Sequence, residues 1–349
     1  MRIKQLLLKN FRNYEEALIP FGPGVNFITG ENGRGKTNIL EALYLLMTGR
    51  SFRTRYLEEL IRFGADSFYI ELLFEKNGIE QTLKMHFEEK RRIVMHNQTP
   101  LVKLSSLFEI LKGTLLLPDD HQLIQGNPKV RRHFLDLQIA QTHPLYLYHL
   151  SRYQQAMKQR NTLLRRKEGE LLDIWEEQMV ESAHYLTALR EKTTETLSKL
   201  LAAPAIELTY LPSPCDKAKL AKSRERDLIL GSTSLGPHKD DLTILLKERS
   251  ARSYASEGQK RHTVAHLRFA EWQRLQTETK EEPLLLIDDA SMSFDPKREE
   301  ALLASLKKYG QVFVTSARFT PPPEAFLLEV VTHGKVQRPS LQAASSLHQ

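Results

Sequence analysis

The segment Gly30-Glu-Asn-Gly-Arg-Gly-Lys-Thr37 constrains this chain more than any other. It matches G-x-x-x-x-G-K-[ST], in which backbone N–H groups curl around a phosphate, the lysine reaches the β- and γ-phosphates, and the hydroxyl joins Mg²⁺. The apolar run Val25–Thr29 precedes it and the amphipathic stretch Asn38–Met47 follows, so the motif lies between a predicted strand and a predicted helix. The positive end of that helix then faces the anion. We expect an α/β fold whose ligands for a nucleotide include Gly30, Glu31, Asn32, Gly33, Arg34, Gly35, Lys36 and Thr37.

A second element of a nucleotide site lies far downstream. The apolar run Pro283–Ile287 predicts a strand buried on both faces, and it ends in the acidic pair Asp288-Asp289. Apolar strands often end in a solvated aspartate, so the acidic pair indicates a nucleotide site only in combination with the motif at 30–37. The first carboxylate can hold Mg²⁺ together with Thr37, and the second can orient or deprotonate a water. We expect ATP and Mg²⁺ as cofactors, Lys36, Asp288 and Asp289 as catalytic residues, and Thr37 and Asp288 as metal ligands.

The segment Ala255-Ser-Glu-Gly-Gln259 precedes a predicted helix that runs from Lys260 to about Gln276. Ser256 is a good N-cap, and Gly258 lets the backbone approach an anion closely. Taken alone, the segment is typical of an ordinary capped helix. Between the other two motifs it resembles the signature sequence of ABC-type ATPases, which binds the γ-phosphate of a nucleotide held by a second subunit. This resemblance implies an ATP-bound homodimer with Ser256, Gly258 and Gln259 as nucleotide ligands.

Composition narrows the class of protein. Lys plus Arg number 50 and Asp plus Glu 43, a formal net charge of +7, which is a weak indication of an acidic partner such as nucleic acid. A single cysteine excludes an intramolecular disulfide and suits a reducing compartment. No apolar run approaches the roughly 18–20 residues of a membrane span, and the N-terminal Leu6–Leu8 is too short for a signal-peptide core. We therefore expect a cytoplasmic protein, nucleoid-associated when on DNA, with no membrane partner.

Basic residues gather in three places that are candidates for DNA contact, because Lys and Arg neutralise phosphates without reading sequence. They are Arg50, Arg53 and Arg55; Arg131 and Arg132; and, in the stretch 152–167, Lys158, Arg160, Arg165 and Arg166. Two alternatives stay open. The stretch 152–167 is followed by an acidic run, 168–181, and the two can simply pair on a solvated surface. Arg131 and Arg132 can form structural ion pairs within the helical section.

The order and content of these motifs resemble the RecF family of ABC/SMC-type ATPases, from Met1 to about Thr315. Besides the three motifs, the matching segments are Leu8–Tyr14, Gly49–Thr54, Glu59–Gly64, Leu117–Asp120, Gly126–Asp136, Gln159–Asn161 and Gly236–Leu242. The segments 126–136 and 236–242 are the most specific, because they belong to this family rather than to ABC ATPases at large. The resemblance implies an α/β, ABC-type P-loop ATPase head (lobe I) interrupted by a mostly α-helical lobe II.

The domain limits that we predict are residues 1–110 and 209–338 for lobe I, 111–208 for the helical insertion, and 339–349 for a flexible tail. By resemblance, the ATP-bound dimer holds gapped DNA or single-strand/double-strand junctions. With RecO and RecR it helps to load RecA, in support of recombinational repair, replication and the SOS response. ATP hydrolysis is then slow and acts as a switch.

The chain departs from the family pattern at a few positions. Phe52 replaces a usual His, Ala255 a usual Leu, Lys239 a usual Arg, and Ser293 an acid, while Thr315-Ser316 occupies the place of a γ-phosphate-sensing His in many ABC ATPases. Three alternative functions compare less well with the sequence or stay open. The insertion is too long for a typical transporter subunit and too short for the coiled coil of an SMC or double-strand-break-repair head. A DNA-binding structural protein that has lost hydrolysis is the third.

Overall fold

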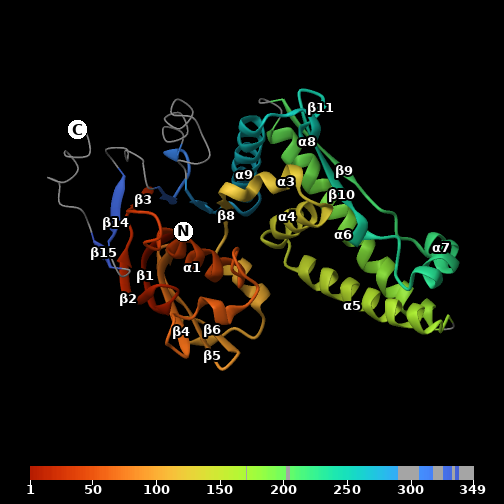
Figure 1. Cartoon of the computed structure of the whole chain (residues 1–349), viewed down its shortest axis with the longest axis horizontal. Helices are drawn as coiled ribbons and strands as arrows, with labels where there is room; N and C mark the ends of the chain where they lie inside the picture. Colours follow the sequence, from red (N-terminus) through yellow and green to blue (C-terminus); the bar gives the residue numbers. More distant parts are fainter. Residues whose placement is uncertain (170, 202–204, 290–305, 317–324, 332–334, 338–349) are drawn as a thin grey trace. The chain divides into compact units, whose positions relative to one another are not determined.

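The computed structural model describes residues 1–169, 171–201, 205–289, 306–316, 325–331 and 335–337. Its internal contacts divide the chain into two compact units. Unit 1 comprises Met1–Asp120 and Leu275–Gln349, and unit 2 comprises His121–Arg274. In Figure 1 the yellow, green and teal elements belong to unit 2. Within the described residues, no helix combines the length and apolarity that crossing a membrane requires.

Unit 1 contains a six-stranded antiparallel sheet in the order β2-β1-β4-β5-β6-β7. The strands are β1 (Arg2–Phe11), β2 (Tyr14–Pro20), β4 (Ser67–Lys76), β5 (Ile79–Glu88), β6 (Arg91–His96) and β7 (Thr99–Pro100). Buried residues alternate with more exposed ones along β4, as expected for a sheet with one face on the core. The hairpin turn between β4 and β5 lies at Asn77-Gly78, with φ of 56° and 75° at its two central residues.

A second six-stranded sheet in unit 1 carries the nucleotide motifs. Its order is β15-β14-β3-β13-β12-β8, from the strands β3 (Val25–Thr29), β8 (Gly113–Leu116), β12 (Leu284–Ile287), β13 (Val312–Thr315), β14 (Phe326–Val330) and β15 (Val336–Gln337). All neighbouring pairs are parallel except β14–β15. All four residues of β12 are buried, which confirms the strand predicted there. The carboxyl ends of β3, β13 and β12 therefore meet at one edge.

Helix α1 (Lys36–Thr48) follows β3 and ends at Gly49, whose left-handed backbone donates its N–H to the Leu45 carbonyl. The sequence predicts one buried face, but Leu40, Ala42 and Leu45 are buried as well. The reason is that α1 shares a single hydrophobic core with residues of both sheets of unit 1. Unit 1 also holds η1 (Leu57–Leu60), η2 (Leu104–Ser106), α2 (Leu107–Ile110) and η3 (Pro118–His121), which ends at the first residue of unit 2.

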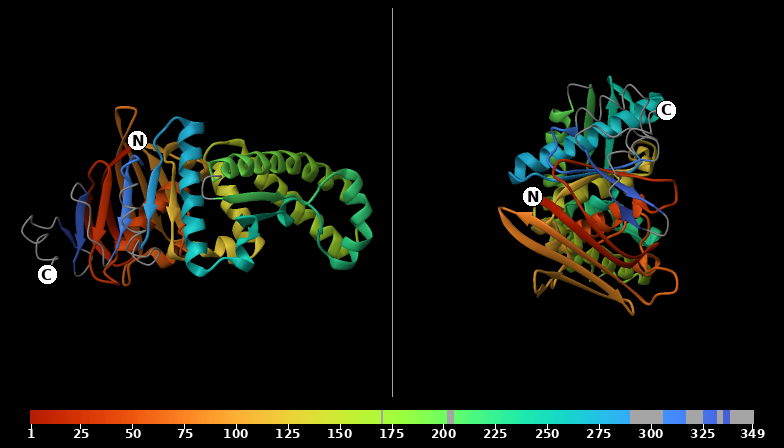
Figure 2. Two further views of the ribbon diagram at one scale, coloured as in Figure 1. Left: turned by 90° about the horizontal axis from the view of Figure 1, so that it is seen from above. Right: turned by 90° about the vertical axis from the view of Figure 1, so that its left-hand side faces the viewer.

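Unit 2 is built around two long helices, α5 (Leu145–Arg166) and α6 (Leu172–Leu200), which lie side by side (Figures 1 and 2). Tyr146 and Tyr153 of α5 pack with Met179 and Leu186 of α6 in its core. The remaining helices are α3 (Gln122–Gln125), α4 (Pro128–Ala140), α7 (Lys217–Leu230), η4 (Pro237–Lys239), α8 (Ala251–Tyr254) and α9 (Glu257–Thr279).

The predicted domain limits differ from the contact-based units. The helical section was expected to end near residue 208, yet unit 2 runs from His121 to Arg274. The physical reason is a three-stranded antiparallel sheet, β11 (Arg249–Ser250), β10 (Asp241–Leu246) and β9 (Ile206–Leu211), which packs through β9 against α6. This sheet ties residues 206–250 to the helices. The tail 339–349 and Ser293 lie outside the described residues.

Candidate nucleotide site

The loop 30–35 adopts a backbone that only glycine tolerates at its two ends. Gly30 has φ of 137°, and a Cβ there would lie 2.4 Å from the Val330 carbonyl oxygen. Gly35, the N-cap of α1, has φ of 112°, and its Cβ would lie 2.6 Å from the side-chain amide of Asn13. Asn13 in turn donates to the Arg34 carbonyl at 2.7 Å. The loop is therefore held in one shape by the neighbouring strand β14 and by the β1–β2 turn.

Lys36 is almost fully buried at the start of α1. Its ammonium donates to the carbonyl oxygens of Gly30 at 2.7 Å and Glu31 at 2.9 Å, so the side chain folds back over its own loop. Burial lowers the pKa of Lys36, while the charges of Asp289 and Asp288 act in the opposite direction. The predicted catalytic lysine and both predicted catalytic carboxylates thus share one electrostatic site.

Asp288 and Thr37 meet although 251 positions separate them. The Thr37 hydroxyl donates to Asp288 Oδ1 at 2.9 Å. The Thr315 hydroxyl at the end of β13, the strand between β3 and β12, donates to the same oxygen at 2.7 Å. Burial raises the pKa of Asp288, and the two hydroxyl hydrogen bonds oppose that shift. No ion pair to Asp288 forms among the described residues, so the buried carboxylate is solvated by hydroxyls alone.

Asp289 follows with a left-handed backbone, φ 46°, which turns the chain sharply after β12. Its N–H donates to Thr315 Oγ1 at 2.9 Å. Thr315 therefore contacts both members of the acidic pair, donating to one and accepting from the other. In the sequence, Thr315 only marks the place of a missing histidine, and its contacts with the acidic pair were not predicted. The parallel register that sets β13 between β3 and β12 was the signal that the sequence lacked.

A buried carboxylate on α1 is the second feature that sequence analysis missed. Glu41 is fully buried, and Arg12 binds it through two nitrogens at 2.9 and 2.7 Å. The Ser51 hydroxyl donates to it at 2.5 Å. Arg53 reaches within 3.6 Å of Glu41 and donates to the Asn38 side chain at 2.8 Å. These contacts fix α1 to the β1–β2 turn and to the segment 50–53.

The signature segment, residues 255–259, forms a reciprocal cap at the start of α9. The Gln259 N–H donates to Ser256 Oγ at 3.3 Å, and the Ser256 N–H donates to Gln259 Oε1 at 2.8 Å. This is a capping box with glutamine at its third helical position. The helix begins at Glu257, earlier than the predicted Lys260. Ser256, Gly258 and Gln259 thus lie together at a helix N-terminus, as their predicted role as anion ligands requires.

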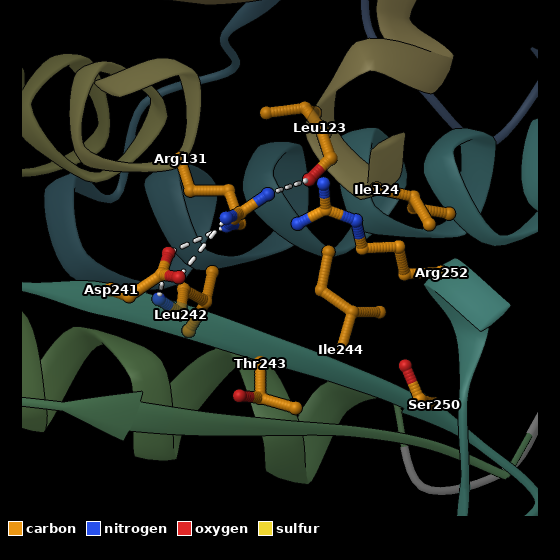
Figure 3. Close-up of a pocket in the computed structure, with 9 residues that line it drawn as sticks. All are labelled: Leu123, Ile124, Arg131, Asp241, Leu242, Thr243, Ile244, Ser250 and Arg252. Atoms are coloured by element: carbon orange, nitrogen blue, oxygen red, sulfur yellow. Dashed lines mark hydrogen bonds and ion pairs between the residues drawn. The ribbon is translucent and has the colours of Figure 1, made fainter. Parts of the chain in front are cut away.

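The prediction that Arg131 contacts DNA is wrong, because this guanidinium is buried in unit 2. Arg131 binds both carboxylate oxygens of Asp241, at 2.6 and 3.0 Å, and donates to the Gly126 carbonyl at 2.8 Å. It lines a cavity of about 130 Å³ beside β10, into which Arg252 also points (Figure 3). Arg132 is half-buried and donates to the Asp240 carbonyl at 2.8 Å. Structural pairing, the open alternative, is what the geometry of Arg131 supports.

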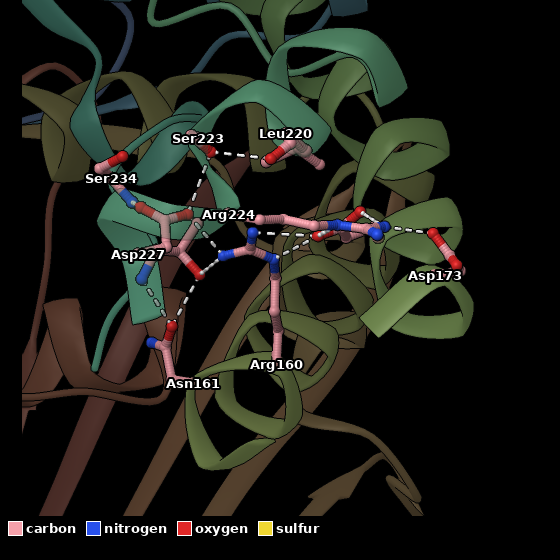
Figure 4. A network of polar contacts seen from close by, with 10 residues as sticks. Arg160, Asn161, Asp173, Leu220, Ser223, Arg224, Asp227 and Ser234 are labelled. Atoms are coloured by element: carbon pink, nitrogen blue, oxygen red, sulfur yellow. Dashed lines mark hydrogen bonds and ion pairs between the residues drawn. The ribbon is translucent and has the colours of Figure 1, made fainter. Parts of the chain in front are cut away.

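Arg160 is likewise a structural residue and not a DNA contact. It is fully buried in unit 2, where it donates to Glu176 at 3.0 Å, Asp227 at 2.8 Å and the Thr233 hydroxyl at 3.0 Å. Figure 4 shows this network together with Arg224, which also binds Glu176 and Asp173. Arg152, at the start of the same basic stretch, pairs with Glu181 at 2.8 Å. Part of the stretch therefore pairs with the acidic run, as the alternative predicted.

The other basic candidates are exposed: Arg50, Arg53 and Arg55 in unit 1, and Lys158, Arg165 and Arg166 in unit 2. Their availability is compatible with phosphate contact, although Arg53 is also held by Asn38. Nearby, Phe52 packs edge-to-face on Tyr44, with ring centroids 5.6 Å apart. The replacement of the family's usual histidine thus adds to the hydrophobic packing at the end of α1.

A phosphate-binding loop after one strand of a parallel sheet, an acidic pair after another and an intervening threonine define the fold and site of an ABC-type P-loop ATPase. Comparison with known proteins then specifies the family. A family model described as "RecF/RecN/SMC N terminal domain" matches residues 2–325. The chain belongs to the RecF family.

Its relatives match over nearly their whole length. The DNA replication and repair protein RecF of Protochlamydia amoebophila is 44% identical over 337 residues, which cover 90% of this chain and 94% of that protein. RecF of Chlamydia caviae is 37% identical, with 90% and 92% covered. RecF of Bacillus thuringiensis is 34% identical, with the same shares.

Solved structures of a RecF protein and of an Smc head are also similar to this chain. A structure described as the recombination mediator protein RecF-ATPrS in the RecFOR pathway has a TM-score of 0.87 and 29% identity, and it covers 97% of this chain and 98% of that one. An Smc head domain from Pyrococcus furiosus has a TM-score of 0.56 at 19% identity over 99% and 98% of the two chains. This second likeness supports the ABC-type head fold alone.

Proposed function

We propose that this chain is an ATP-dependent DNA-binding protein of recombinational gap repair. Two ATP-bound copies clamp gapped or single-strand/double-strand junction DNA, and with RecO and RecR they help to load RecA. This role supports replication and induction of the SOS response. Family membership and a solved relative described as a recombination mediator in the RecFOR pathway support the proposal. Slow hydrolysis of ATP to ADP and phosphate returns the clamp to its open state.

The observation that carries this proposal is the contact between Thr37 and Asp288. A hydroxyl from the phosphate-binding loop and a carboxylate from another strand present oxygen ligands to one point, as Mg²⁺ requires. The donor set fits the ion for a second reason. Within the described part of the chain, the side-chain partners of the buried Asp288 are hydroxyls, so a cation beside it would offset the desolvation that raises its pKa.

Each residue of the site has a distinct task. The N–H groups of the loop 30–35 and the N-terminus of α1 bind the phosphates, and Lys36 leaves its two carbonyl partners to reach them. Thr37 and Asp288 hold Mg²⁺, which when bound neutralises charge on the β- and γ-phosphates. Asp289 orients or deprotonates the attacking water, and Thr315 fixes the backbone from which it projects.

Dimerisation depends on the signature segment. In the proposed dimer Ser256, Gly258 and Gln259 of one copy bind the γ-phosphate held by the other, at the positive N-terminal end of α9. Replacing Ser256 with arginine places a long cation at this helix N-terminus. We expect Ser256→Arg to bind ATP normally and to remain monomeric. Loss of ATP binding itself would contradict the role in trans.

Sedimentation velocity tests the proposal directly. The wild type and Lys36→Met are compared with ATP and Mg²⁺, with and without gapped duplex DNA. Lys103→Met, which changes an exposed lysine in unit 1, is the matched control. We expect ATP-dependent dimers on DNA for the wild type and the control, and monomers for Lys36→Met. A wild type that stays monomeric with ATP and ignores DNA would refute the clamp, whereas a dimer without turnover would favour a structural DNA-binding protein.

A further inference from the structure

Two histidines of α9 face each other just after the signature segment. His262 and His266 are four residues apart, so they project from one face of the helix on successive turns. Their Nε2 atoms lie 3.2 Å apart, with ring centroids separated by 4.3 Å and ring planes at 70°. Both side chains are half-buried, which leaves the pair accessible to small solutes.

This geometry matches what a transition-metal ion requires of two imidazoles. An ion about 2.05 Å from both nitrogens, a typical imidazole–zinc distance, would see them at an angle of about 100°. That value lies between the tetrahedral angle and the right angle of octahedral or square-planar sites. The two nitrogens now share a hydrogen bond and point toward each other, so small rotations of both rings would aim their lone pairs at the ion. The helix backbone need not change, and water can complete the coordination.

Proton balance is also compatible with metal binding. In the neutral pair, one ring carries its proton on Nε2 and shares it with the Nε2 lone pair of the other. When an ion takes the place of that proton, the first ring carries its proton on Nδ1 instead, and none is released. Burial and the neighbouring His262 lower the pKa of His266 to about 4, so this ring is neutral at pH 7.

We propose that His262 and His266 form a two-imidazole site for a borderline divalent transition ion, Zn²⁺, Cu²⁺ or Ni²⁺. Imidazole nitrogen selects these ions over Mg²⁺ and Ca²⁺, which prefer oxygen. The site is thus chemically distinct from the magnesium ligands Thr37 and Asp288. Among the described residues no group of three or more His, Cys, Asp or Glu can hold a metal ion, so this is a two-ligand site.

An ion bound to the two histidines would stiffen the start of α9, where the signature segment lies. His262 lies three residues after Gln259, so an ion bound to the pair links the second and third turns of the helix, directly after the first turn that carries Gly258 and Gln259. A link between successive turns restricts fraying of a helix end. The ion would then stiffen the segment that the proposed dimer uses, although the site itself needs neither ATP nor a second copy.

Isothermal titration of the full-length protein with Zn²⁺, in the absence of ATP, tests the proposal. His262→Gln and His266→Gln are compared with the wild type, and His184→Gln, which changes an exposed histidine of α6, is the matched control. We expect the wild type and the control to share one site that either test variant weakens at least tenfold. Millimolar Mg²⁺ should not compete. Equal Zn²⁺ affinity and stoichiometry in the wild type and both test variants would overturn the proposal.

Electron paramagnetic resonance of bound Cu²⁺ identifies the metal ligands directly, and a general loss of protein stability would not change the ligand pattern. We expect superhyperfine coupling to two imidazole nitrogens in the wild type and loss of that pattern in each test variant. Thermal melting in EDTA should be the same for all four proteins, since both side chains are partly exposed. A two-nitrogen signal that persists in His262→Gln and His266→Gln would place the copper elsewhere and refute the site.

Discussion

Two buried carboxylates, one in each unit, have opposite surroundings. Asp227 in unit 2 is fully buried and receives the Arg160 guanidinium at 2.8 Å, the Ser223 hydroxyl at 3.1 Å and the Ser234 N–H at 3.1 Å. Asp288 in unit 1 is nearly as buried, yet its side chain accepts hydrogen bonds from two hydroxyls, of Thr37 and Thr315. Burial raises the pKa of Asp288.

The difference separates a structural charge from a functional one. A buried carboxylate that an arginine neutralises contributes to one fixed packing arrangement, and removing either partner is costly. A buried carboxylate with hydroxyl partners only is stabilised further when a cation arrives. Another buried carboxylate of unit 1, that of Glu41, is paired with an arginine, Arg12. The exception at Asp288 therefore marks the place where we propose that Mg²⁺ binds.

The largest effect is expected from breaking the structural pair in unit 2. Arg160→Met removes the guanidinium that pairs with Asp227, while Glu176 keeps its contact with Arg224. We expect the free energy of unfolding to fall by about 3–5 kcal/mol, as for other buried pairs that lose one partner. Urea denaturation followed by circular dichroism measures the change. Lys158→Met, an exposed position two residues away, should change it by less than about 0.5 kcal/mol. Equal stability of the two variants would contradict the structural role.

The second effect concerns the functional carboxylate. Asp288→Asn keeps a group that can accept from Thr37 and Thr315 but removes the charge. We expect Mg²⁺-dependent ATP hydrolysis to fall about 100-fold or more, since several kcal/mol of transition-state stabilisation depend on the metal. The stability without nucleotide should stay equal or rise, because a buried charge is lost. Phosphate release and thermal melting measure these two quantities.

Asp227→Asn is the matching change in unit 2 and sharpens the comparison. It should destabilise the protein because Arg160 then loses one of its two anionic partners. ATP hydrolysis by the folded protein should stay within about twofold of the wild type. A loss of stability in Asp288→Asn as large as that in Asp227→Asn would show that both carboxylates are structural.

A smaller effect is expected at the intervening strand. Thr315→Val removes the hydroxyl that contacts both Asp288 and the Asp289 N–H. Losses at residues that orient metal ligands are typically 10- to 100-fold, and we expect hydrolysis to fall about tenfold. Thr114→Val on β8 of the same sheet is the control, because the buried Thr114 hydroxyl has no hydrogen-bond partner among the residues that the structure describes. The control should hydrolyse ATP at the wild-type rate, and equal rates for both variants would remove Thr315 from the site.

The smallest effect is expected at the signature segment. Ser256→Ala removes half of the capping box with Gln259. Loss of an N-cap costs about 1 kcal/mol, so amide exchange in the first turn of α9 should become faster by about fivefold. Ser253→Ala, at an exposed position of α8, should leave that exchange unchanged. Unaltered protection in Ser256→Ala would mean that the cap contributes nothing to the helix end.

Local patterns in the sequence were enough to predict much of unit 1. The strand 284–287 and the position of the loop 30–37 after a strand and at the start of a helix depend on short-range chemistry and were confirmed. Thr315 could not be assigned, because its role follows from sheet order, which places β13 between β3 and β12. Non-local register of this kind leaves no signal in the residues themselves.

Charged residues were harder to assign for the same reason. Arg160 and Arg165 belong to the same basic stretch of the sequence, yet the first is fully buried and the second is exposed. The difference arises because Glu176 and Asp227, which neutralise Arg160, come from α6 and α7. The limits of unit 2 were missed because β9 pairs with β10 across the 29 residues of intervening chain, 212–240.

Sedimentation velocity of Asp289→Asn with ATP, Mg²⁺ and gapped DNA is the most direct test of the proposal that ATP binding closes the clamp and hydrolysis opens it. If Asp289 activates water while Lys36, Thr37 and Asp288 hold the nucleotide and its ion, this variant binds ATP but cannot release the clamp. We expect this variant to form a persistent dimer on the DNA, and we expect EDTA to dissociate the dimer because it removes Mg²⁺. A variant that stays monomeric on addition of ATP, or whose dimer forms equally well without Mg²⁺, would contradict it.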